Sequence, residues 1–466
     1  MQRNYKDFID SLKNKTVMFC GLGKSNMPFL EILAKNGTNI IAYDGKSADK
    51  IDDTITKVLK SYENISYYLG DETAWELTPD ILVRTPGMNF YSEKISNIRA
   101  KNVIVTSEME IFFDYCPCPI IGVTGSDGKT TVTSIISEIL KHDGKTVHVG
   151  GNIGKPLLPE IEGIHKNDIA VVELSSFQLM SMRKSPDHAV ITNISPNHLD
   201  IHSDMDEYVN AKKQIFLHQN AFSNAILNYD NSETRKFADE VRGKVTFFSF
   251  SEKLKNGVWK DNDNNIVSSV NGKNEIIMSS GDIKIPGNHN IENYLAAIAC
   301  VRDMVSKESI VKTAKEFEGV KHRIEFVKEV GGVKFYNDSI ASTPTRTMSG
   351  ALSVFDGKIT LIAGGYDKKL TFTELASKIN DKVSILVLLG NTSEKIKSEV
   401  LNSKNYDPGK LKIFTAKSME EAVTTAYGNS PPGSVVVLSP ACASFDLYKN
   451  FEERGNDFKN LVNKIK

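Results

Sequence analysis

Residues 119–131 read PIIGVTGSDGKTT, and this stretch decides the fold of the chain. An apolar run leads into a glycine-rich turn, and the turn leads into Val132, Ile135, Ile136, Ile139 and Leu140. Apolar residues at this spacing line one face of an α-helix, so the segment predicts a strand, a turn and a helix. The N–H groups of such a turn and of the helix N-terminus bind anions, which predicts a phosphate loop.

The loop supplies seven candidate ATP contacts, which are Gly125, Ser126, Asp127, Gly128, Lys129, Thr130 and Thr131. Lys129 can reach the β- and γ-phosphates, and the Thr130 hydroxyl can ligate Mg²⁺. The strict phosphate-loop pattern begins with glycine where this chain has Val123. A plain glycine turn before a helix therefore stays open as the alternative.

The strand, turn and helix pattern repeats on both sides of the loop, which favours an α/β fold with mainly parallel sheets. Upstream, TVMFCGLGKSN (residues 16–26) and NIIAYD, which ends at Asp44, form a Rossmann-like start. Downstream, KTVHVG, DIAVVEL and HAVITNI are apolar enough to be strands buried on both faces. The strand-like runs VKFYND, KITLIAGG, VSILVLLG and SVVVLSP follow Lys321. At roughly 150 residues per domain, we expect three domains, at residues 1–113, 114–320 and 321–466.

The charge balance excludes some partners. The chain has 57 Lys and Arg against 58 Asp and Glu, so it lacks the general positive field that gathers nucleic acid or an anionic membrane. The N-terminal segment MQRNYKDFIDSLKNK has no apolar core typical of a signal peptide, and no stretch approaches the ~18 apolar residues that span a bilayer. We therefore expect a cytoplasmic protein with no bound nucleic acid and no membrane insertion.

The five cysteines are Cys20, Cys116, Cys118, Cys300 and Cys442. They include no C-x-x-C pair, which favours reduced thiols over a disulfide framework. Cys116-Pro117-Cys118 is interpreted as structural, with a redox or metal-binding pair as the alternative.

Ligands of an open parallel sheet lie beyond the carboxyl ends of its strands. HVGGNIG places Asn152 at such an end, DIAVVEL places Glu173 and ITNISPNH places His198. A carboxylate, an imidazole and an amide beside a nucleotide loop predict a Mg²⁺ and substrate pocket. His198 and His202 have the spacing of a zinc helix, but HLDIH lacks the expected glutamate, and His202 is interpreted as a surface or structural residue.

The chain resembles the Mur ligases over nearly its whole length. The segments that carry the resemblance are TGSDGKTT, GGNIG, ELSSFQL, TNISPNHLD, PGNHNIEN, KHRIE and LSPACASFD, in the order and approximate spacing of that family. The resemblance implies a Rossmann-like N-terminal domain that binds a UDP-linked substrate, a central ATPase domain and a Rossmann-like C-terminal domain. It also implies that ATP phosphorylates a carboxylate and that an amine then attacks the acyl phosphate.

The resemblance assigns the chemistry to Lys129, Glu173, His198 and Lys212. Thr130 and Glu173 would hold one Mg²⁺, and Glu173 with His198 a second. Lys212, in YVNAKKQIF, matches a lysine that the family carries as a CO₂-derived carbamate near the second ion. Taken alone, this lysine reads as part of a solvated helix face.

The resemblance also implies the remaining contacts. For ATP they are Asn290, Asn293, Arg323 and Asp338; for the UDP-linked substrate Ser25, Asp44, Gly87, Asn152 and His198; and for the amino acid Ser342, Lys368, Ser444 and Phe451. Without the resemblance, Arg323 reads as an ion-pair residue, Asp338 as a turn or cap residue, Ser444 as a helix cap and Phe451 as core.

The members that add D-glutamate to UDP-N-acetylmuramoyl-L-alanine fit best. The block before the phosphate loop argues against folylpolyglutamate synthases, and the absence of D-N-P-[RN] argues against members that add a diamino acid. The expected partners are UDP-N-acetylmuramoyl-L-alanine, D-glutamate and ATP, bound by a monomer. Two features depart from the common pattern: Ile340 replaces the lysine of NDSKATN, and GLGKSN is not the commonest N-terminal loop.

Three alternatives remain open. The first is another Mur ligase, chiefly the type that adds L-alanine. The second is a nucleotide-driven switch or motor, although N-K-x-D and the LSGGQ-type signature are missing. The third is a dinucleotide-binding oxidoreductase, although GLGKSNMP lacks the third glycine of the fingerprint.

Overall fold

The computed structural model describes residues 4–196, 202–355 and 357–465. The chain divides into two compact units. The first comprises Met1–Asp282 and Ile291–Lys315, and the second comprises Ile283–Asn290 and Glu316–Lys466.

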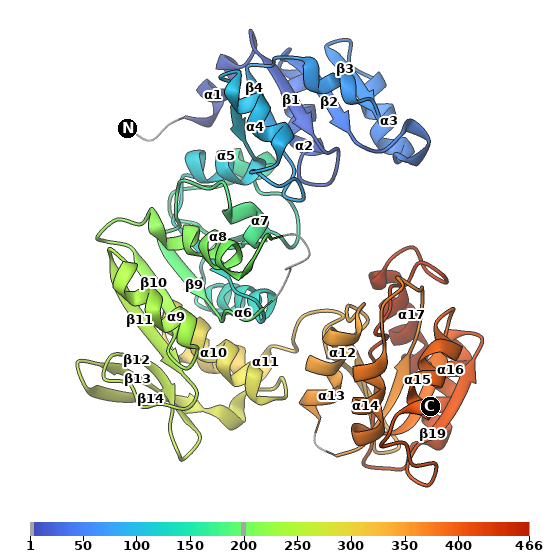
Figure 1. Cartoon of the computed structure of the whole chain (residues 1–466). Coiled ribbons are helices and arrows are strands. Elements are labelled where there is room, and N and C mark those ends of the chain that lie inside the picture. Colours follow the sequence, from blue (N-terminus) through green and yellow to red (C-terminus); the bar gives the residue numbers. More distant parts are fainter. Residues whose placement is uncertain (1–3, 197–201, 356, 466) are drawn as a thin grey trace. The chain divides into compact units, whose positions relative to one another are not determined.

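The first unit begins with a parallel sheet of five described strands in the order β3-β2-β1-β4-β5 (Figure 1). The strands are β1 (Thr16–Cys20), β2 (Asn39–Asp44), β3 (Ile65–Leu69), β4 (Ile81–Arg84) and β5 (Ile104–Thr106). The helices are α1 (Tyr5–Ser11), α2 (Met27–Lys35), α3 (Asp53–Lys60), α4 (Glu93–Ala100) and α5 (Glu108–Tyr115). The strand order reverses between β1 and β4, where open α/β sheets bind their ligands.

A second sheet of nine described strands follows, in the order β14-β13-β12-β11-β10-β9-β6-β8-β7. The strands are β6 (Ile120–Thr124), β7 (Val147–Gly151), β8 (Ile169–Glu173), β9 (His188–Ile191), β10 (Asn224–Asn228), β11 (Lys244–Ser249), β12 (Gly257–Lys260), β13 (Asn265–Val270) and β14 (Lys273–Ser279). The pairs from β7 to β12 are parallel, whereas β12, β13 and β14 pair antiparallel. The helices are α6 (Lys129–His142), α7 (Ser176–Leu179), α8 (Met205–Leu217), α9 (Ser232–Lys236), α10 (Asn288–Val301) and α11 (Lys307–Glu316).

One hydrophobic cluster runs from the five-stranded sheet into the nine-stranded sheet. It includes Phe19 and Phe29 from the first sheet and α2, Phe112 from α5, and Ala170 and Ile191 from the second sheet. Continuous burial of this kind explains why the two sheets fall in one compact unit, because the apolar surface of α5 is shared between them.

The second unit contains a sheet of six described strands in the order β15-β16-β20-β17-β18-β19. The strands are β15 (Glu325–Val330), β16 (Val333–Asn337), β17 (Ile359–Ala363), β18 (Val383–Leu389), β19 (Lys412–Ala416) and β20 (Val435–Leu438). Only β15 is antiparallel to its neighbour among these described strands. The helices are α12 (Pro344–Ser349), α13 (Ala351–Val354), α14 (Thr373–Lys382), α15 (Ser393–Asn402), α16 (Met419–Asn429) and α17 (Phe451–Lys464).

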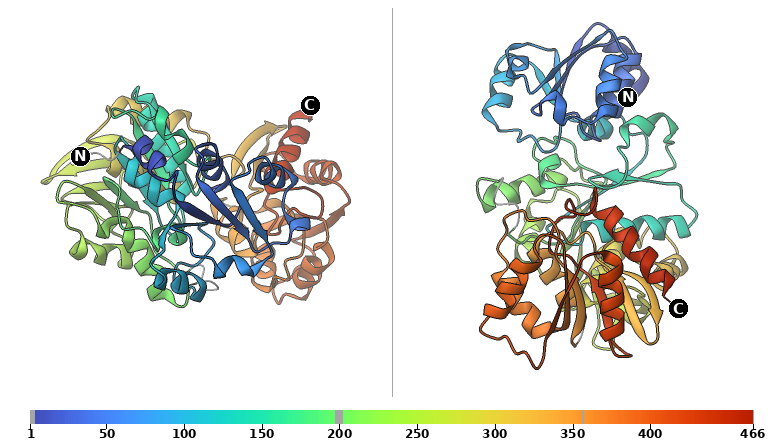
Figure 2. Two further views of the ribbon diagram at one scale, coloured as in Figure 1. Left: turned by 90° about the horizontal axis from the view of Figure 1, so that it is seen from above. Right: turned by 90° about the vertical axis from the view of Figure 1, so that its right-hand side faces the viewer.

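Both faces of this third sheet are buried. Leu361 packs in one cluster with residues of α14 and α15, and its neighbour Ile362 packs in another with residues of α16 and α17. Successive residues of a strand point to opposite faces, so helices cover the sheet on both sides, as the right-hand view of Figure 2 shows.

The predicted α/β class with mainly parallel sheets is confirmed. The apolar positions predicted for the helix after the phosphate loop all lie in α6 and are fully buried. In the third sheet, the antiparallel β15 was not predicted and β19 was missed; in the other two sheets, β3, β4, β5, β10 and β11 were not named. None of the described helices is long and apolar enough to cross a membrane.

Candidate active site

The phosphate loop connects β6 to α6, and two of its glycines are sterically required. Gly125 and Gly128 have φ values of 148° and 78°. A Cβ on Gly125 would lie 1.9 Å from Thr192 Oγ1, and a Cβ on Gly128 would lie 2.4 Å from Asn293 Oδ1. No larger residue fits either position without movement of these side chains.

The segment after β9 holds the loop in place. Ser126 N donates to Asn193 O at 2.9 Å, and Asp127 N donates to Asn193 Oδ1 at 2.9 Å. Ser126 Oγ donates to Ser195 O at 2.9 Å. The loop is therefore fixed by backbone and side-chain bonds rather than by its own sequence alone.

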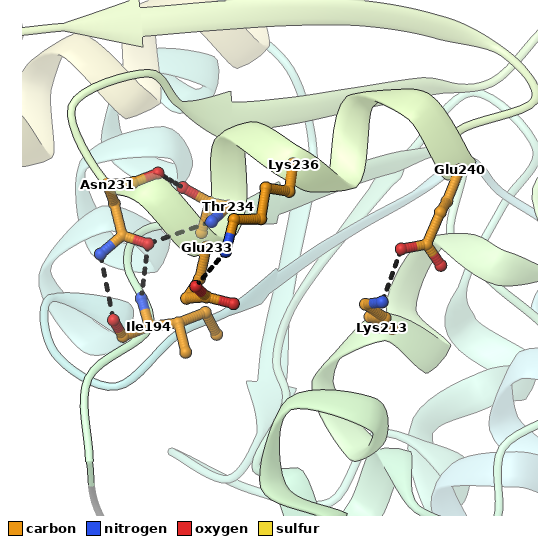
Figure 3. A network of polar contacts seen from close by, with 7 residues as sticks. All are labelled: Ile194, Lys213, Asn231, Glu233, Thr234, Lys236 and Glu240. Carbon is orange, nitrogen blue, oxygen red and sulfur yellow. Dashed lines mark hydrogen bonds and ion pairs between the residues drawn. The ribbon is translucent and has the colours of Figure 1, made fainter. Parts of the chain in front are cut away.

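Asn231 also bonds the segment that follows β9 (Figure 3). Its Nδ2 donates to Ile194 O at 3.0 Å, while its Oδ1 accepts from Thr234 N at 3.1 Å at the start of α9. The same side chain thus caps a helix and anchors the residue between Asn193 and Ser195.

Lys129, Thr130, Asn152 and Glu173 meet around the loop. Lys129 Nζ donates to Gly125 O at 2.8 Å and to Ser126 O at 2.9 Å. Glu173, the last residue of β8, is almost fully buried, and its two carboxylate oxygens accept from Thr130 Oγ1 at 2.7 Å and Asn152 Nδ2 at 2.8 Å. The predicted carboxylate and amide therefore lie together with the Thr130 hydroxyl, and such oxygen donors suit Mg²⁺.

Lys212 joins this group from α8. Its Nζ donates to Gly125 O at 2.8 Å and lies 4.7 Å from the ring centre of Tyr208. Burial holds the pKa of this amine well below its usual value, and the nearby Lys129 ammonium lowers it further. The expectation of a solvated lysine is wrong for Lys212, which is 2% exposed.

Lys213, the next residue on α8, has different partners. Lys213 forms an ion pair with Glu240 at 2.5 Å, which Figure 3 displays. Of two adjacent lysines on one helix, Lys212 bonds the phosphate loop, whereas Lys213 is partly buried and has a carboxylate partner.

His198, predicted as a metal and substrate ligand, lies outside the described residues. His202 is buried and structural rather than superficial: its ring stacks on Phe177 at 5.1 Å, and its Nε2 shares a hydrogen bond with Ser176 Oγ at 2.9 Å. The described residues contain no cluster of three or more His, Cys, Asp or Glu side chains suited to a metal ion.

The two candidate asparagines of α10 have separate surroundings. Asn293 lies against Gly128 and is 7% exposed. Asn290, in the second unit, donates from Nδ2 to Pro286 O at 2.6 Å. Thr131 is buried in the first turn of α6.

In the second unit, Arg323 stands in an unusual backbone segment. Its neighbours His322 and Ile324 have φ values of 64° and 45°, a region that a β-branched residue rarely adopts. Asp338 follows β16, is buried and accepts from Ser439 Oγ at 2.7 Å. Burial raises the pKa of Asp338 to about 7, although Ser439 and the Arg323 charge oppose the rise.

The four predicted amino-acid contacts follow β16, β17 and β20. Ser342 lies beyond β16, Lys368 is exposed beyond β17, and Ser444 is buried beyond β20. Tyr366 N donates to Ala443 O at 2.9 Å, which joins the Lys368 loop to the Ser444 loop. Phe451 begins α17, and its carbonyl accepts from Ser339 Oγ at 2.8 Å.

The predicted contacts for the UDP-linked substrate follow β1, β2 and β4. Asp44 ends β2, and its carboxylate accepts from Leu22 N at 2.9 Å and from Lys46 N at 3.0 Å. A Cβ on Gly21 would lie 2.6 Å from Thr85 Cγ2, so the loop that carries Ser25 runs close to the loop that carries Gly87.

Several residues of these sites escaped the sequence reasoning. Thr192, Asn193 and Tyr208 all bond the phosphate loop. Tyr208 and Lys212 are spaced i, i+4 on α8, so this spacing was the available signal. Arg454 donates to Ser339 O at 2.8 Å and to Cys442 O and Ala443 O at 3.1 Å, but a single arginine in α17 carries no local signal.

Comparison with known proteins gives two domain matches. The Mur ligase middle domain matches residues 123–301, and the Mur ligase, glutamate ligase domain matches residues 322–442. The UDP-N-acetylmuramoylalanine--D-glutamate ligase of Clostridium acetobutylicum is 45% identical over 470 residues, and that of Acetivibrio thermocellus is 48% identical over 469 residues. Each of these alignments covers 100% of both chains.

Solved structures share the fold at lower identity. The UDP-N-acetylmuramate-alanine ligase of Thermotoga maritima has a TM-score of 0.57 at 17% identity and covers 97% of this chain and 100% of its own. The UDP-N-acetylmuramoylalanyl-D-glutamyl-2,6-diaminopimelate--D-alanyl-D-alanyl ligase of Acinetobacter baumannii has a TM-score of 0.58 at 17% identity and covers 98% of each chain.

Proposed function

The chain belongs to the Mur ligase family, and from this membership we propose that it joins D-glutamate to UDP-N-acetylmuramoyl-L-alanine with cleavage of ATP. The observation that carries the choice of substrates is the identity of 45% and 48%, over the full chain, to ligases named for this reaction. The product is a cytoplasmic precursor of bacterial peptidoglycan, and the enzyme acts as a monomer of three domains, at residues 1–113, 114–320 and 321–466.

The reaction has two chemical steps. The alanyl carboxylate attacks the γ-phosphorus of ATP, which gives an acyl phosphate and ADP. The amine of D-glutamate then attacks the acyl carbon, and the tetrahedral intermediate expels phosphate as the amide forms and the amine loses a proton. Both steps bring anions together, so the protein must hold positive charge and N–H donors around the phosphoryl group.

Lys129 supplies the positive charge, and the backbone of the loop supplies the N–H donors. The Lys129 ammonium is bound to two carbonyls of its own loop, which keeps it at the start of α6. From there it would reach the β- and γ-phosphates, while residues 125–131 surround the phosphate chain. Asn290, Asn293, Arg323 and Asp338 would contact the rest of the nucleotide.

Thr130 and Glu173 fit a first Mg²⁺, and Glu173 with His198 would hold a second. The fit rests on the donor set, because a buried carboxylate beside a hydroxyl offers the hard oxygen ligands that Mg²⁺ prefers. Bound magnesium would offset negative charge on the phosphoryl oxygens and on the carboxylate. Asn152 orients Glu173 through its amide, and it would also contact the UDP-linked substrate with His198.

Lys212 is proposed to carry a carbamate. The neutral amine attacks CO₂ and loses a proton, so a low amine pKa favours the reaction, and burial of Lys212 acts in that direction. The product is an anion in place of a second ammonium beside Lys129, and it would orient or ligate the second Mg²⁺.

The uridine diphosphate of one substrate and the D-glutamate are assigned to different sheets. Ser25, Asp44 and Gly87 would bind the uridine diphosphate at the carboxyl ends of β1, β2 and β4. The D-glutamate contacts would be Ser342, Lys368, Ser444 and Phe451, with Lys368 the cation for a carboxylate. Ile340 cannot supply the charge of the lysine that stands there in the common family pattern, so a contact made by that lysine is absent here or supplied by another residue.

The test is phosphate release from ATP by the purified protein with Mg²⁺. Parallel reactions contain UDP-N-acetylmuramoyl-L-alanine with D-glutamate, L-glutamate or L-lysine, and UDP-N-acetylmuramate with L-alanine. Release with D-glutamate alone, together with the amide product by mass spectrometry, is the expected result. Release with another pair would overturn the substrate assignment, and no release in any reaction would overturn the ligase assignment.

A further inference from the structure

Arg84 is a buried charge outside the phosphate-loop site. It is the last residue of β4, its exposed fraction is 0%, and it directly precedes the Thr85–Met88 loop that carries Gly87. Burial lowers the pKa of its guanidinium, but the group remains far above the titration range of a neutral solution. A buried arginine needs partners, and those of Arg84 come from two directions.

One nitrogen of the guanidinium bonds the loop that directly follows Arg84. Arg84 Nη1 donates to Met88 O at 3.0 Å, so the charge spans the turn from its first residue to its last. The aromatic ring of Phe90 lies 5.7 Å from the guanidinium carbon. These contacts fix the conformation of the segment that contains Gly87.

The other side reaches the segment after Glu173. Arg84 Nη2 donates to Phe177 O at 3.0 Å and to Ser181 Oγ at 2.6 Å. Phe177 belongs to α7, which begins three residues after Glu173 at the end of β8. One side chain therefore bonds a loop of the five-stranded sheet to a helix of the nine-stranded sheet within the first compact unit.

A carboxylate completes the arrangement. Ser181 Oγ accepts from Arg84 and donates to Glu110 Oε2 at 2.9 Å, and Ser107 Oγ donates to the same oxygen at 2.8 Å. Glu110 lies on α5, the helix between the two sheets. The guanidinium thus has its counter-charge one hydroxyl away, which makes its burial tolerable.

A small cavity links the same arginine to the other substrate loop. Arg84 and Asn26 both line it, and Arg84 Nε and Asn26 Oδ1 have no partner in the part of the chain that the structure describes. Asn26 Nδ2 donates to Gly21 O at 2.9 Å and so holds the loop that carries Ser25. Because both residues line this cavity, a bridging water molecule there is one way to give each atom a partner.

We propose that Arg84 is a positioning residue for the UDP-linked substrate: it holds the Thr85–Met88 loop in fixed register with the segment that follows Glu173. The inference rests on the proposed function, in which Gly87 contacts the uridine diphosphate and Glu173 would hold the magnesium that offsets charge on the reacting carboxylate. The substrate must span these two points, so a shift of the loop displaces the reacting carboxylate. A displacement of about 1 Å is enough to lower turnover about a hundredfold.

The experiment compares Arg84→Met with Arg99→Met. Arg99 is an exposed residue of α4 that lies over the same Phe90 ring, at 4.6 Å, so it controls for loss of an arginine at this ring. We expect Arg84→Met to raise the KM for UDP-N-acetylmuramoyl-L-alanine about tenfold or more, with a fall in kcat, while the KM for ATP stays within about twofold. Arg99→Met should leave all three constants within about twofold of the wild-type values.

Two further variants separate charge from geometry. Arg84→Lys keeps the charge without the planar fork and should restore only part of the lost affinity. Ser181→Ala removes one acceptor and leaves the charge in place, with a smaller rise of the same KM. If Arg84→Met loses its cooperative thermal transition, the Arg84→Lys and Ser181→Ala variants replace it in the test. A rise of the KM for UDP-N-acetylmuramoyl-L-alanine relative to the KM for ATP then supports the inference, and an unchanged ratio of these two KM values overturns it.

Calorimetric binding of UDP-N-acetylmuramoyl-L-alanine without ATP distinguishes this inference from the proposed function. Binding that weakens in Arg84→Met but not in Arg99→Met supports the inference, even if the wild-type protein shows no turnover with D-glutamate, which would overturn the proposed function alone. Unchanged binding and unchanged KM in a folded Arg84→Met variant would overturn the inference. An equal rise of the KM for ATP would also overturn it, because general loosening then explains the effect.

Discussion

Alanine at Gly128 should weaken both the fold and the binding of nucleotide, and Gly144 at the other end of α6 offers a matched control for the effect on binding. Gly128 precedes the helix with a φ of 78°, and Gly144 follows it with a φ of 80°. Left-handed backbone costs a residue with a Cβ about 1–2 kcal/mol relative to glycine, so both substitutions carry the same local cost.

The two sites differ in what the new methyl group meets. A Cβ on Gly144 has nothing within 4 Å, whereas a Cβ on Gly128 lies 2.4 Å from Asn293 Oδ1. The Asn293 side chain must therefore move, and displacing a buried amide adds about 1–2 kcal/mol. We expect a loss of about 1 kcal/mol for Gly144→Ala and about 3 kcal/mol for Gly128→Ala.

Thermal unfolding and calorimetric titration with ATP and Mg²⁺ measure the two effects. At about 2–4 °C per kcal/mol, Gly144→Ala should lower the Tm by a few degrees and Gly128→Ala by roughly three times as much. Gly128→Ala should also raise the Kd for ATP about tenfold, whereas Gly144→Ala should leave it unchanged. Wild-type affinity for ATP in a folded Gly128→Ala variant would refute the assignment of this loop to the phosphates.

Three other outcomes follow from the buried titratable and charged groups. Protein equilibrated with ¹³C-labelled bicarbonate should show a carbamate carbon signal that Lys212→Met lacks, and identical spectra would refute the modification. Glu173→Gln keeps the shape of the side chain and removes its charge, so kcat should fall about a hundredfold or more while the Tm changes little; nearly normal turnover would exclude Glu173 as the metal ligand. Burial raises the pKa of Glu108 to about 7, so the folded state binds a proton that the unfolded state has released, and stability should fall as the pH rises from about 4.5 to about 7. Urea unfolding across this range should show a weaker pH dependence for Glu108→Gln, and parallel curves for the two proteins would contradict the assignment.

The sequence was most informative where chemistry and local structure use the same residues. Gly125, Gly128, Lys129 and Thr130 predict both a turn and a phosphate site, and the predicted turn between β6 and α6 is confirmed. Glu173 and Asn152 could be placed because Glu173 ends β8 and Asn152 directly follows β7, and these two strands are parallel neighbours in one sheet. Such ends meet at one edge, so sequence positions translate directly into neighbours in space.

The contacts that hold these residues could not be found in this way. Arg84 and Arg454 each bond carbonyls outside their own strand or helix. Neither residue belongs to a pattern with a period or a motif, because most of its partners are backbone carbonyls far away in the sequence, whose identity the sequence does not encode. The antiparallel strand β15 was missed for a related reason, since its residues are only partly buried and lack the apolar run that marked its neighbours.

Lys212 shows how tertiary context reverses a sound local reading. An Ala-Lys-Lys-Gln stretch on a helix predicts solvated ammonium groups, but Lys213 is paired with Glu240 and its side chain is only 19% exposed. Lys212 lies one position earlier on the same helix, and its side chain bonds Gly125 O and lies near Lys129. A second permanent cation at this place would be desolvated and repelled. A neutral amine relieves both costs, and a carbamate would convert the repulsion into attraction. The position of the side chain, rather than its type, therefore makes CO₂ chemistry reasonable at this residue and not at its neighbour.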